Sequence, residues 1–256
     1  MGKLPSIAQP GSQTLLRGLD VIEAVAGGSL PLAELALRLG FTRSTTHRLA
    51  SALVERGYLQ MAPRIGYRLG PRLLELGHAA QLQVDLVQVA RPHIEALSAA
   101  TGDTIHLGVL DGNQAYYLDK IAGQRRITIR SHVGDRHPLT STGLGKALIL
   151  DRPVGYWAER HLSDGTGGSY AEWERRMRDY AASGHAFDLE ENEDQIRCVA
   201  APVRDAGGRI VAAISVSSAA QYMDDARMSC LAGDVRTAAA AISRDLGAPA
   251  PPESKG

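Results

Sequence analysis

Three short amphipathic segments, packed into the first 57 residues, constrain the fold of this chain more than any other feature. Residues 12–27 and 32–39 place apolar side chains at helical spacing, and a third such run occupies residues 42–57. Residues 58–70 then carry two short β-prone pieces around a Pro/Gly-containing turn. A tight turn at Gly40 between the second and third helices predicts a helix-turn-helix, and the following hairpin makes it winged.

The third helix of this motif is expected to expose a polar, basic face. Leu49, Leu53 and Val54 form its apolar stripe, so the opposite side is left to polar residues that can reach base edges in a major groove. The candidate DNA-binding residues on this helix are Arg43, Ser44, Thr45, His47, Arg48 and Ser51. On the hairpin, Arg64 and Arg68 can hold phosphates. The alternative is a solvated face on a winged helix that binds a protein.

The charge distribution also singles out this end of the chain. The whole sequence is balanced at 28 basic and 28 acidic groups, but residues 1–75 hold nine Lys and Arg against five Asp and Glu. This excess favours an anionic partner, double-stranded operator DNA, for the first part only. Ordinary scatter of charge on 75 residues is the competing explanation.

Residues 71–89 are expected to form a linker helix, separated by Gly77 and Pro92 from the first helix of the next domain. Its leucines, among them Leu76, should pack against a second subunit. In residues 90–247, short strands joined by Asp-Gly and Gly-Gly turns alternate with helices, which predicts an α+β domain with a mostly antiparallel sheet. The strands are expected at 105–110, 115–121, 127–131, 198–203 and 210–216, and the helices at 142–150, 170–183 and 224–246. Residues 248–256 are expected to form a disordered tail.

Several function classes are disfavoured by the sequence. Cys198 and Cys230 are too few for a disulfide framework, and neither has a partner at metal-ligand spacing, so no metal and no cofactor are expected. No apolar run is long enough to span a membrane, and the chain start lacks a secretory pattern, so a cytoplasmic location is expected. Residues 140–147 fail the phosphate-loop pattern, and no nucleophile motif surrounds Cys198, which argues against an enzyme.

Three blocks in order give the chain a recognisable resemblance. They are GYRLGPRLLELG at 66–77, TSTGLGKAL at 140–148 and FDLEENEDQIRCVAAPVRDAGGRIVAAISVSS at 187–218. With the winged helix they resemble the IclR family of bacterial transcription regulators over nearly the whole chain. The resemblance implies a GAF-like effector domain that binds a small metabolite, often a carboxylic acid, and assembly into homodimers or dimers of dimers.

The resemblance also implies a set of effector-binding residues. Carried over position by position, these are Gly143, Leu144, Asp188, Cys198, Ser215 and Ser217, with Ile196 as an apolar wall. Their chemistry is reasonable: the start of the 142–150 helix can seat a carboxylate, Ser215 and Ser217 share one face of a strand, and Asp188 can accept from a hydroxyl. Each also has a plain structural explanation, namely backbone bonding for the serines, packing for Cys198 and a solvated face for Asp188.

The nature of the effector is more open. Arg130, His132 and His137 precede the TSTGLGKAL helix and can reach extra hydroxyls or a second carboxylate. The TGLGKAL form is similar to regulators of sugar-acid catabolism, which favours a hydroxylated acid sensed by a regulator of a catabolic operon. An aromatic acid is the first alternative, and a metabolite-sensing winged-helix protein that binds a protein partner is the second.

Overall fold

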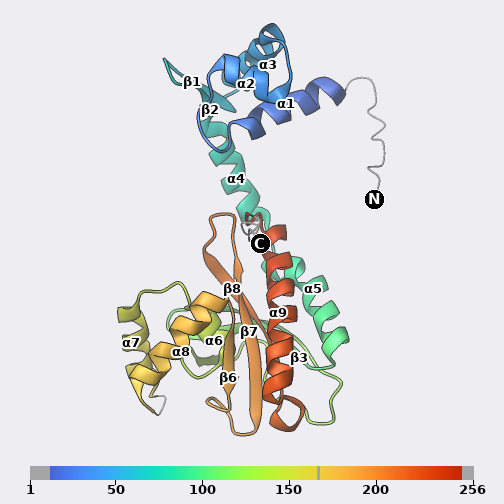
Figure 1. The fold of residues 1–256 in the computed structure, drawn as a ribbon. Helices are drawn as coiled ribbons and strands as arrows, with labels where there is room; N and C mark the ends of the chain where they lie inside the picture. The colour runs from blue at the N-terminus through green and yellow to red at the C-terminus, as the bar shows by residue number, and fades with distance from the viewer. Residues whose placement is uncertain (1–11, 166–167, 250–256) are drawn as a thin grey trace. The chain divides into compact units, whose positions relative to one another are not determined.

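The computed structural model describes residues 12–165 and 168–249, and the chain divides into two compact units between Val84 and Asp85 (Figure 1). None of the helices in these two ranges is long and apolar enough to cross a membrane. The expected tail lies mostly outside the described residues, which end at Pro249.

The smaller unit is a winged helix-turn-helix, as the sequence predicts. Its elements are α1 (Ser12–Ala24), α2 (Leu32–Leu39), α3 (Arg43–Glu55), β1 (Leu59–Ala62), β2 (Gly66–Leu69) and α4 (Pro71–Gln83). Gly40 ends α2 in the left-handed conformation, and the Thr42 hydroxyl caps α3 by accepting from the Thr45 N–H at 3.2 Å. The core is formed by Val21, Val25, Leu35, Leu49, Ala50, Leu59 and Tyr67.

The helix break after the winged helix lies elsewhere than predicted. Gly77 and Pro92 both lie inside helices, α4 and α5 (Leu86–Thr101), and the chain breaks at 84–85 instead. Asp85 is the reason, because its carboxylate accepts from the N–H groups of Val87 at 2.9 Å and Gln88 at 3.2 Å and so starts a new helix. The expected linker helix therefore ends at Gln83 and not at residue 89.

The larger unit is built on a six-stranded antiparallel sheet in the order β5-β4-β3-β8-β7-β6. The strands are β3 (Thr104–Asp111), β4 (Gln114–Ile121), β5 (Arg136–Pro138), β6 (Ala186–Leu189), β7 (Ile196–Arg204) and β8 (Ile210–Ala219). The register places Asp188 opposite Cys198 and Cys198 opposite Ser217, so three neighbouring strands present these side chains on one face. The expected α+β class with an antiparallel sheet is confirmed.

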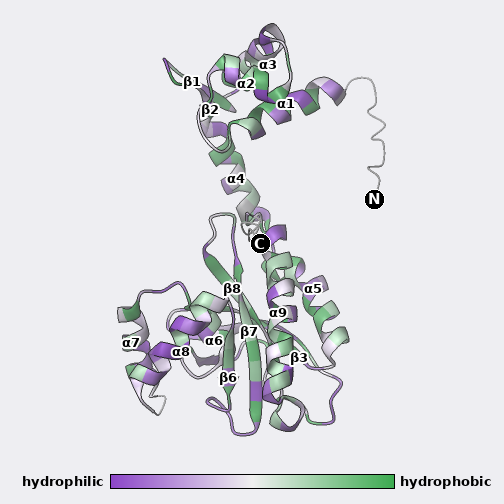
Figure 2. Cartoon of the chain, viewed as in Figure 1, coloured by the Kyte–Doolittle hydropathy of each residue, from purple (hydrophilic) through white to green (hydrophobic). Residues whose placement is uncertain are grey.

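Helices cover both faces of this sheet (Figure 1). On one face lie α5 and α9 (Asp225–Asp245), packed on alternate strand residues such as Ile105, Val199 and Ile214. On the other face lie α6 (Gly143–Leu148), α7 (Val154–Asp164) and α8 (Tyr170–Ser183). A short 3-10 turn, η1 (Ala220–Tyr222), precedes α9. The central strands β7 and β8 are hydrophobic along most of their length because both their faces are covered (Figure 2).

Three elements differ from the sequence-based expectation. Residues 127–131 are not a strand, because the Lys120 ammonium donates to the carbonyls of Ile129 at 2.9 Å and Ser131 at 2.6 Å in place of a ladder partner. Strands β5 and β6 were not predicted, since three or four residues carry too little periodicity. Helix α7 was missed as well, although Pro153 precedes it and Gly165 ends it.

Candidate DNA interface and ligand cleft

Helix α3 exposes the face that the sequence predicts. Arg43, Ser44, His47, Arg48 and Ser51 are exposed and Thr45 is half-buried, whereas the interleaved Thr46, Leu49 and Ala50 are buried. Thr46 is held inside by a hydrogen bond from its hydroxyl to the Thr42 carbonyl at 3.0 Å. The exposed set therefore forms one polar, basic surface on a helix whose other side is fixed in the core.

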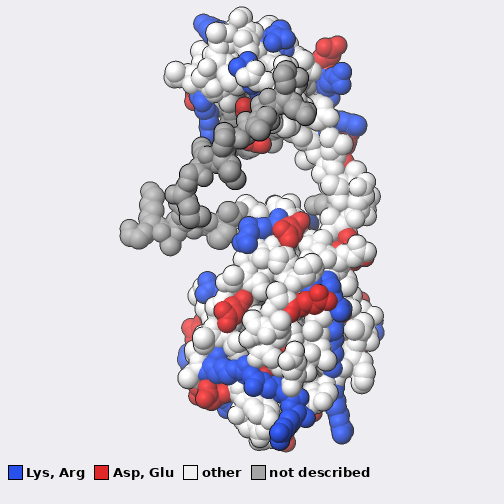
Figure 3. Space-filling model, turned by 90° about the vertical axis from the view of Figure 1, so that its right-hand side faces the viewer, with Lys and Arg blue, Asp and Glu red and all other residues white. Residues whose placement is uncertain are grey.

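The wing adds two more arginines to the same unit. Arg68 is exposed on β2 and donates to the Gln60 side chain at 3.1 Å. Arg64 lies at the tip of the hairpin with a positive φ of 67°, a backbone conformation that costs a non-glycine residue about 1 kcal/mol. In Figure 3 this unit displays more Lys and Arg than Asp and Glu, whereas the larger unit shows both signs interleaved.

A cleft on the α6 side of the sheet collects most of the predicted effector-binding residues. Of the predicted set, Arg130, Asp188, Ile196, Cys198 and Ser217 line it, together with His137. The other residues that line it are His106, Tyr117, Ile129, Ser131, Thr142, Asn192 and Glu193. The free space inside is about 40 Å³, room for a few water molecules, so a larger molecule enters only when the surrounding loops move.

Four of the singled-out residues do not line the cleft. Leu144 is buried in the core between α6 and the sheet, and His132 is exposed on the preceding loop. Ser215 lies two residues before Ser217 on β8, is fully buried, and its hydroxyl has no hydrogen-bond partner among the described residues. Gly143 lies behind Cys198 and not at the cleft surface.

The contact between Gly143 and Cys198 explains why a glycine opens helix α6. A Cβ atom at position 143 would lie 2.5 Å from the Cys198 sulfur, so no larger residue fits without a shift of the strand. Complete burial raises the pKa of the Cys198 thiol to about 12, so the group is a neutral thiol. A neutral thiol of this kind is no activated nucleophile.

Asp188 is a buried carboxylate at the end of β6. Its Oδ1 accepts from the Glu191 N–H at 2.8 Å, and its side chain is almost fully covered. Burial raises the pKa of Asp188 to about 6, although the nearby Lys146 ammonium opposes this shift. Lys146, itself buried, donates to the Phe187 carbonyl at 2.9 Å and forms an ion pair with Glu191. The N–H groups of Glu191 and Asn192 also favour the ionised form, but burial outweighs them together with the Lys146 charge.

The loop between β6 and β7 carries backbone strain beside the cleft. Glu190 and Gln195 both have positive φ, 68° and 63°, although neither is a glycine. The Glu190 carboxylate holds the loop by accepting from the Gln195 N–H at 3.2 Å and from the Arg197 guanidinium at 3.0 Å. Between the two strained residues lie Asn192 and Glu193, which line the cleft. Strain of this kind is typical of segments that rearrange on ligand binding.

Several cleft residues were not predicted from the sequence. His106 and Tyr117 come from β3 and β4, and Ser131 comes from the segment wrongly expected to be a strand. The only available signal was polar residues at alternate positions of otherwise apolar strands, which also occurs in solvent-facing strands.

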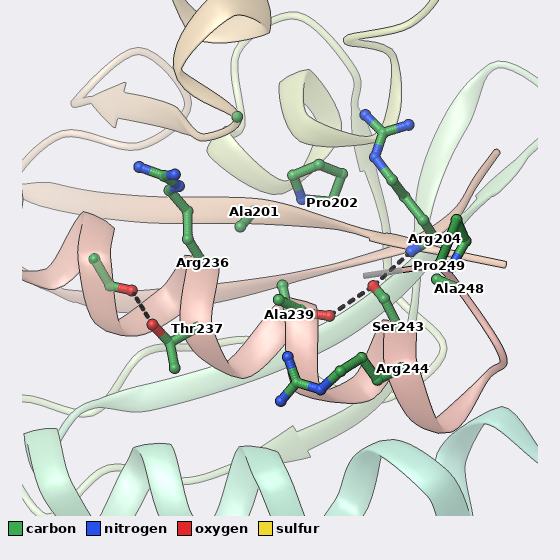
Figure 4. Close-up of a pocket in the computed structure, with 13 residues that line it drawn as sticks. Ala201, Pro202, Arg204, Arg236, Thr237, Ala239, Ser243, Arg244, Ala248 and Pro249 are labelled. Carbon is green, nitrogen blue, oxygen red and sulfur yellow. Dashed lines mark hydrogen bonds between the residues drawn. The ribbon is translucent and has the colours of Figure 1, made fainter. Parts of the chain in front are cut away.

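A second cavity is larger but chemically poorer. It has a volume of about 620 Å³ and lies between α9 and β7 (Figure 4). Its floor is made of small residues such as Ala201, Ala239 and Ala240, and the Ser243 hydroxyl is already used between the Ala239 carbonyl and the Arg204 N–H. Because its side chains do not converge on a common point, it does not form a comparable polar site. Within the described ranges, no group of three or more His, Cys, Asp or Glu residues could hold a metal ion.

Comparisons with known proteins agree with this architecture. A model of the IclR helix-turn-helix domain matches residues 14–63, and a model of the bacterial transcriptional regulator IclR C-terminal domain matches residues 78–244. The HTH-type transcriptional regulator XynR of Escherichia coli (strain K12) is 34% identical over 253 residues, covering 94% of this chain and 100% of the relative. The DNA-binding transcriptional repressor YiaJ of the same strain is 33% identical over 252 residues, covering 93% and 89%.

Among solved structures, HmgR of Pseudomonas aeruginosa has the same fold. Its TM-score is 0.81 at 24% identity, covering 93% of this chain and 100% of that one. Both family models and two full-length relatives above 30% identity thus agree with the winged helix and the sheet domain described above. The chain therefore belongs to the IclR family of bacterial transcriptional regulators, which are DNA-binding proteins and not enzymes.

Proposed function

We propose that this protein is a cytoplasmic regulator of a catabolic operon. It binds its operator as a dimer through α3 and the wing formed by β1 and β2. A small hydroxylated carboxylic acid, bound in the cleft on the α6 side of the sheet, controls this binding. The observation that carries the proposal is the cleft itself, where Asp188, Cys198 and Ser217 from three neighbouring strands line a polar space that becomes large enough for a ligand when the surrounding loops move.

The DNA-binding part rests on exposed basic residues attached to a rigid core. Arg48 is exposed in the second turn of α3 while its neighbour Leu49 is buried, so the guanidinium can reach a base edge without any change of fold. Arg43 at the start of α3 and Arg64 and Arg68 on the wing are placed to hold phosphates on either side.

Arg48→Ala is expected to weaken binding to DNA selected by the wild-type protein from a random pool by about 10- to 100-fold, the loss typical for one specific base contact. Gel retardation at two salt concentrations measures the effect. Arg244→Ala, which removes an exposed arginine of α9, serves as the matched control and should change nothing. Equal affinity of the Arg48 variant and the wild type would remove α3 from the interface and favour a protein-binding winged helix.

Dimer formation would cover apolar side chains that the smaller unit leaves exposed. On α1 these are Leu15, Leu16 and Leu19, and on α4 they are Leu74, Leu76 and Leu82. Leu74 and Leu82 are 78% and 75% exposed, more than Leu76 at 40%. Six exposed leucines in one small unit exceed what a monomer normally shows, so we propose that a second copy covers them.

The double variant Leu74→Asp with Leu82→Asp is expected to weaken the dimer by at least tenfold, because two carboxylates would have to be buried in an apolar interface. Sedimentation equilibrium measures this. Leu162→Asp, at a leucine of α7 that is 84% exposed, provides the control for adding charge to the surface. A double variant that associates as strongly as the wild type would show that these leucines lie outside the interface.

The acid-sensing part rests on the polarity of the cleft. We propose that the carboxylate lies beside Ser217, near the first turn of α6. The Gly143 N–H is used by Cys198 and the Gly145 N–H by the Thr142 hydroxyl, so the backbone of Gly143 and Leu144 would contribute only after a local rearrangement. Ser215, which is fully buried beyond the cleft lining, would likewise join Ser217 only when the surrounding loops move. Asp188 would accept from a ligand hydroxyl, Ile196 and Cys198 would pack against the ligand, and Arg130 would close the mouth. An acid acting this way must change operator affinity by the same factor by which operator DNA changes acid affinity.

A further inference from the structure

Three aromatic rings form the wall of the cleft on the β5 side of the sheet. His106 on β3, Tyr117 on β4 and His137 on β5 all line the cleft, and we call them the ring wall. The ring centroid of Tyr117 lies 4.6 Å from that of His106 and 4.6 Å from that of His137, and the interplanar angles are 28° and 32°, respectively. The stack fixes all three rings in place, because moving one would break its contact with the next.

Two polar atoms of the ring wall have no partner. Nε2 of His137 is buried without a partner among the described residues. The hydroxyl of Tyr117 makes no hydrogen bond to a described residue either, but it is not fully buried, although the residue as a whole is only 7% exposed. A buried polar group left unpaired costs about 1–3 kcal/mol, so the His137 nitrogen, on a cleft wall that also carries the unbonded Tyr117 hydroxyl, indicates that a ligand supplies the missing bond.

The third ring is bonded internally and supports the other two. Nε2 of His106 lies 2.7 Å from the Ser131 hydroxyl, and Nδ1 lies 3.5 Å from the Ser217 hydroxyl. His106 therefore joins the ring wall to Ser217, on the side of the cleft where we place the carboxylate. The Tyr117 hydroxyl is close enough to Cys198 and Asp188 for their charges to add to the burial that raises its pKa, so it faces the part of the cleft that Asp188 lines.

The ring wall carries no charge near neutral pH. Burial lowers the pKa of His106 to about 3, lowers that of His137 and raises that of Tyr117. The ammonium of Lys120, which lies behind the wall, is already engaged by the carbonyls of Ile129 and Ser131. At the mouth, Arg130 and Glu193 are both exposed and carry opposite charges. No surplus cation therefore faces the ring wall.

We propose that the ring wall, together with the adjacent Asp188, is a subsite for uncharged hydroxyl or carbonyl groups of the ligand. The effector is then a hydroxylated monocarboxylate, and dicarboxylates and unsubstituted acids are excluded. This inference rests on the proposed acid-sensing function and narrows its ligand class. A hydroxyl suits the subsite because it can donate and accept at once, which matches a phenol hydroxyl beside a neutral imidazole nitrogen.

Calorimetry on the full chain tests the inference with a panel of probe acids. The panel contains the three- to six-carbon acids hydroxylated on every carbon beyond the carboxylate, in all common stereoisomers. Each is matched with the unsubstituted acid of equal length and with the dicarboxylate of the same hydroxylation, and benzoate is added. We expect the best hydroxylated monocarboxylate to bind at least tenfold tighter than both of its matched acids.

Tyr117→Phe then isolates the subsite. Removal of one hydroxyl should weaken binding of that acid by about 3- to 10-fold, the range for one neutral hydrogen bond, and should leave the unsubstituted acid within twofold. His137→Phe, which keeps a ring in the stack, should have a similar effect. Tyr116→Phe is the matched control, because Tyr116 is the adjacent residue of β4, lies outside the cleft lining and stacks on Arg136. Thermal unfolding without ligand checks that each variant is folded.

The outcomes separate this inference from the proposed function. If the unsubstituted acid, the dicarboxylate or benzoate binds as tightly as the hydroxylated acid, acid sensing stands but the uncharged hydroxyl subsite is overturned. The same holds if Tyr117→Phe and His137→Phe both leave the affinity for the hydroxylated acid unchanged. If no acid of the panel binds the wild type, the proposed acid effector fails and the inference fails with it.

Discussion

Replacing Asp103 by Asn is expected to lower the free energy of unfolding of the larger unit by about 3 kcal/mol, at the low end of the range for breaking a buried ion pair. Asp103 is fully buried and receives the Arg125 guanidinium at 3.1 Å, the Arg227 guanidinium and the Ser218 hydroxyl at 2.8 Å. Asparagine keeps the shape but loses the charge, and its NH₂ group would face one of the donors.

The two arginines that bind Asp103 make further contacts, and these account for the size of the expected effect. Arg125 also donates to the Thr101 carbonyl at 3.0 Å, and Arg227 donates to the same carbonyl at 3.1 Å. Asp103 thus connects the end of α5, the loop after β4, the end of β8 and the start of α9. The arginine side chains are 36% and 26% exposed, so water relieves part of the loss and the cost stays below that of a fully enclosed pair.

Thermal and urea unfolding of the full chain measure the change, which corresponds to a lower Tm by roughly 6–12 °C for a unit of this size. Asp111→Asn is the matched control, because its ion pair with Arg136 is half exposed on both sides and should contribute less than about 1 kcal/mol. Equal losses in the two variants would show that the Asp103 network is no more important than a surface ion pair.

Local rules were sufficient to predict the smaller unit. Its helices have clear periodicity, Gly40 supplies a left-handed turn and Thr42 supplies a cap, so sequence and structure agree almost residue by residue. The break at 84–85 was missed because Pro92 is the stronger helix-breaking signal in the sequence, yet Pro92 lies inside α5, where it removes one backbone hydrogen bond without ending the helix. The capping side chain of Asp85 instead determines where the new helix begins.

In the larger unit, the cleft could be predicted only where a sequence block marks it. Asp188, Cys198 and Ser217 lie in such blocks, and the register of three strands brings them together. The residues next to His106 and Tyr117 in the sequence do not mark them as cleft residues. Their position in the cleft depends on which face of the sheet α6 covers and on a register shift at Gly108. Leu144 and Ser215 have family positions like those of true cleft residues, but their side chains point into the interior.

Asp188→Asn is expected to make the protein more stable and less responsive to its effector at pH 7.5. Burial raises the pKa of Asp188 from 3.8 to about 6, so the folded wild type is penalised for ionising this group. The penalty is fully present above pH 6 and disappears as the pH falls below 4, where the carboxyl is protonated in both folded and unfolded states. An asparagine oxygen still accepts from the Glu191 N–H, so the loop keeps its anchor.

The stability gain should be about 1–3 kcal/mol at pH 7.5 and close to zero at pH 4, since each pKa unit corresponds to about 1.4 kcal/mol. Lys146 and Glu191, the nearest charged groups, act on Asp188 in opposite directions, so their effects partly cancel. Urea unfolding at both pH values measures the difference. Asp194→Asn, an exposed residue of the same loop, should show no gain at either pH.

The same substitution should weaken binding of the hydroxylated acid by about 10- to 100-fold, because a ligand hydroxyl loses an ionised acceptor worth about 1.5–3 kcal/mol. In the wild type, binding should weaken correspondingly as the pH falls through 6 and Asp188 is protonated. If the buried charge of Asp188 serves ligand binding and lowers the stability of the fold, its removal should raise the stability and weaken ligand binding at the same time.

A variant that is more stable but binds with wild-type affinity would mean that Asp188 faces the cleft without touching the ligand. A variant that is less stable at pH 7.5 would mean that the Lys146 ammonium more than compensates the cost of burying the carboxylate.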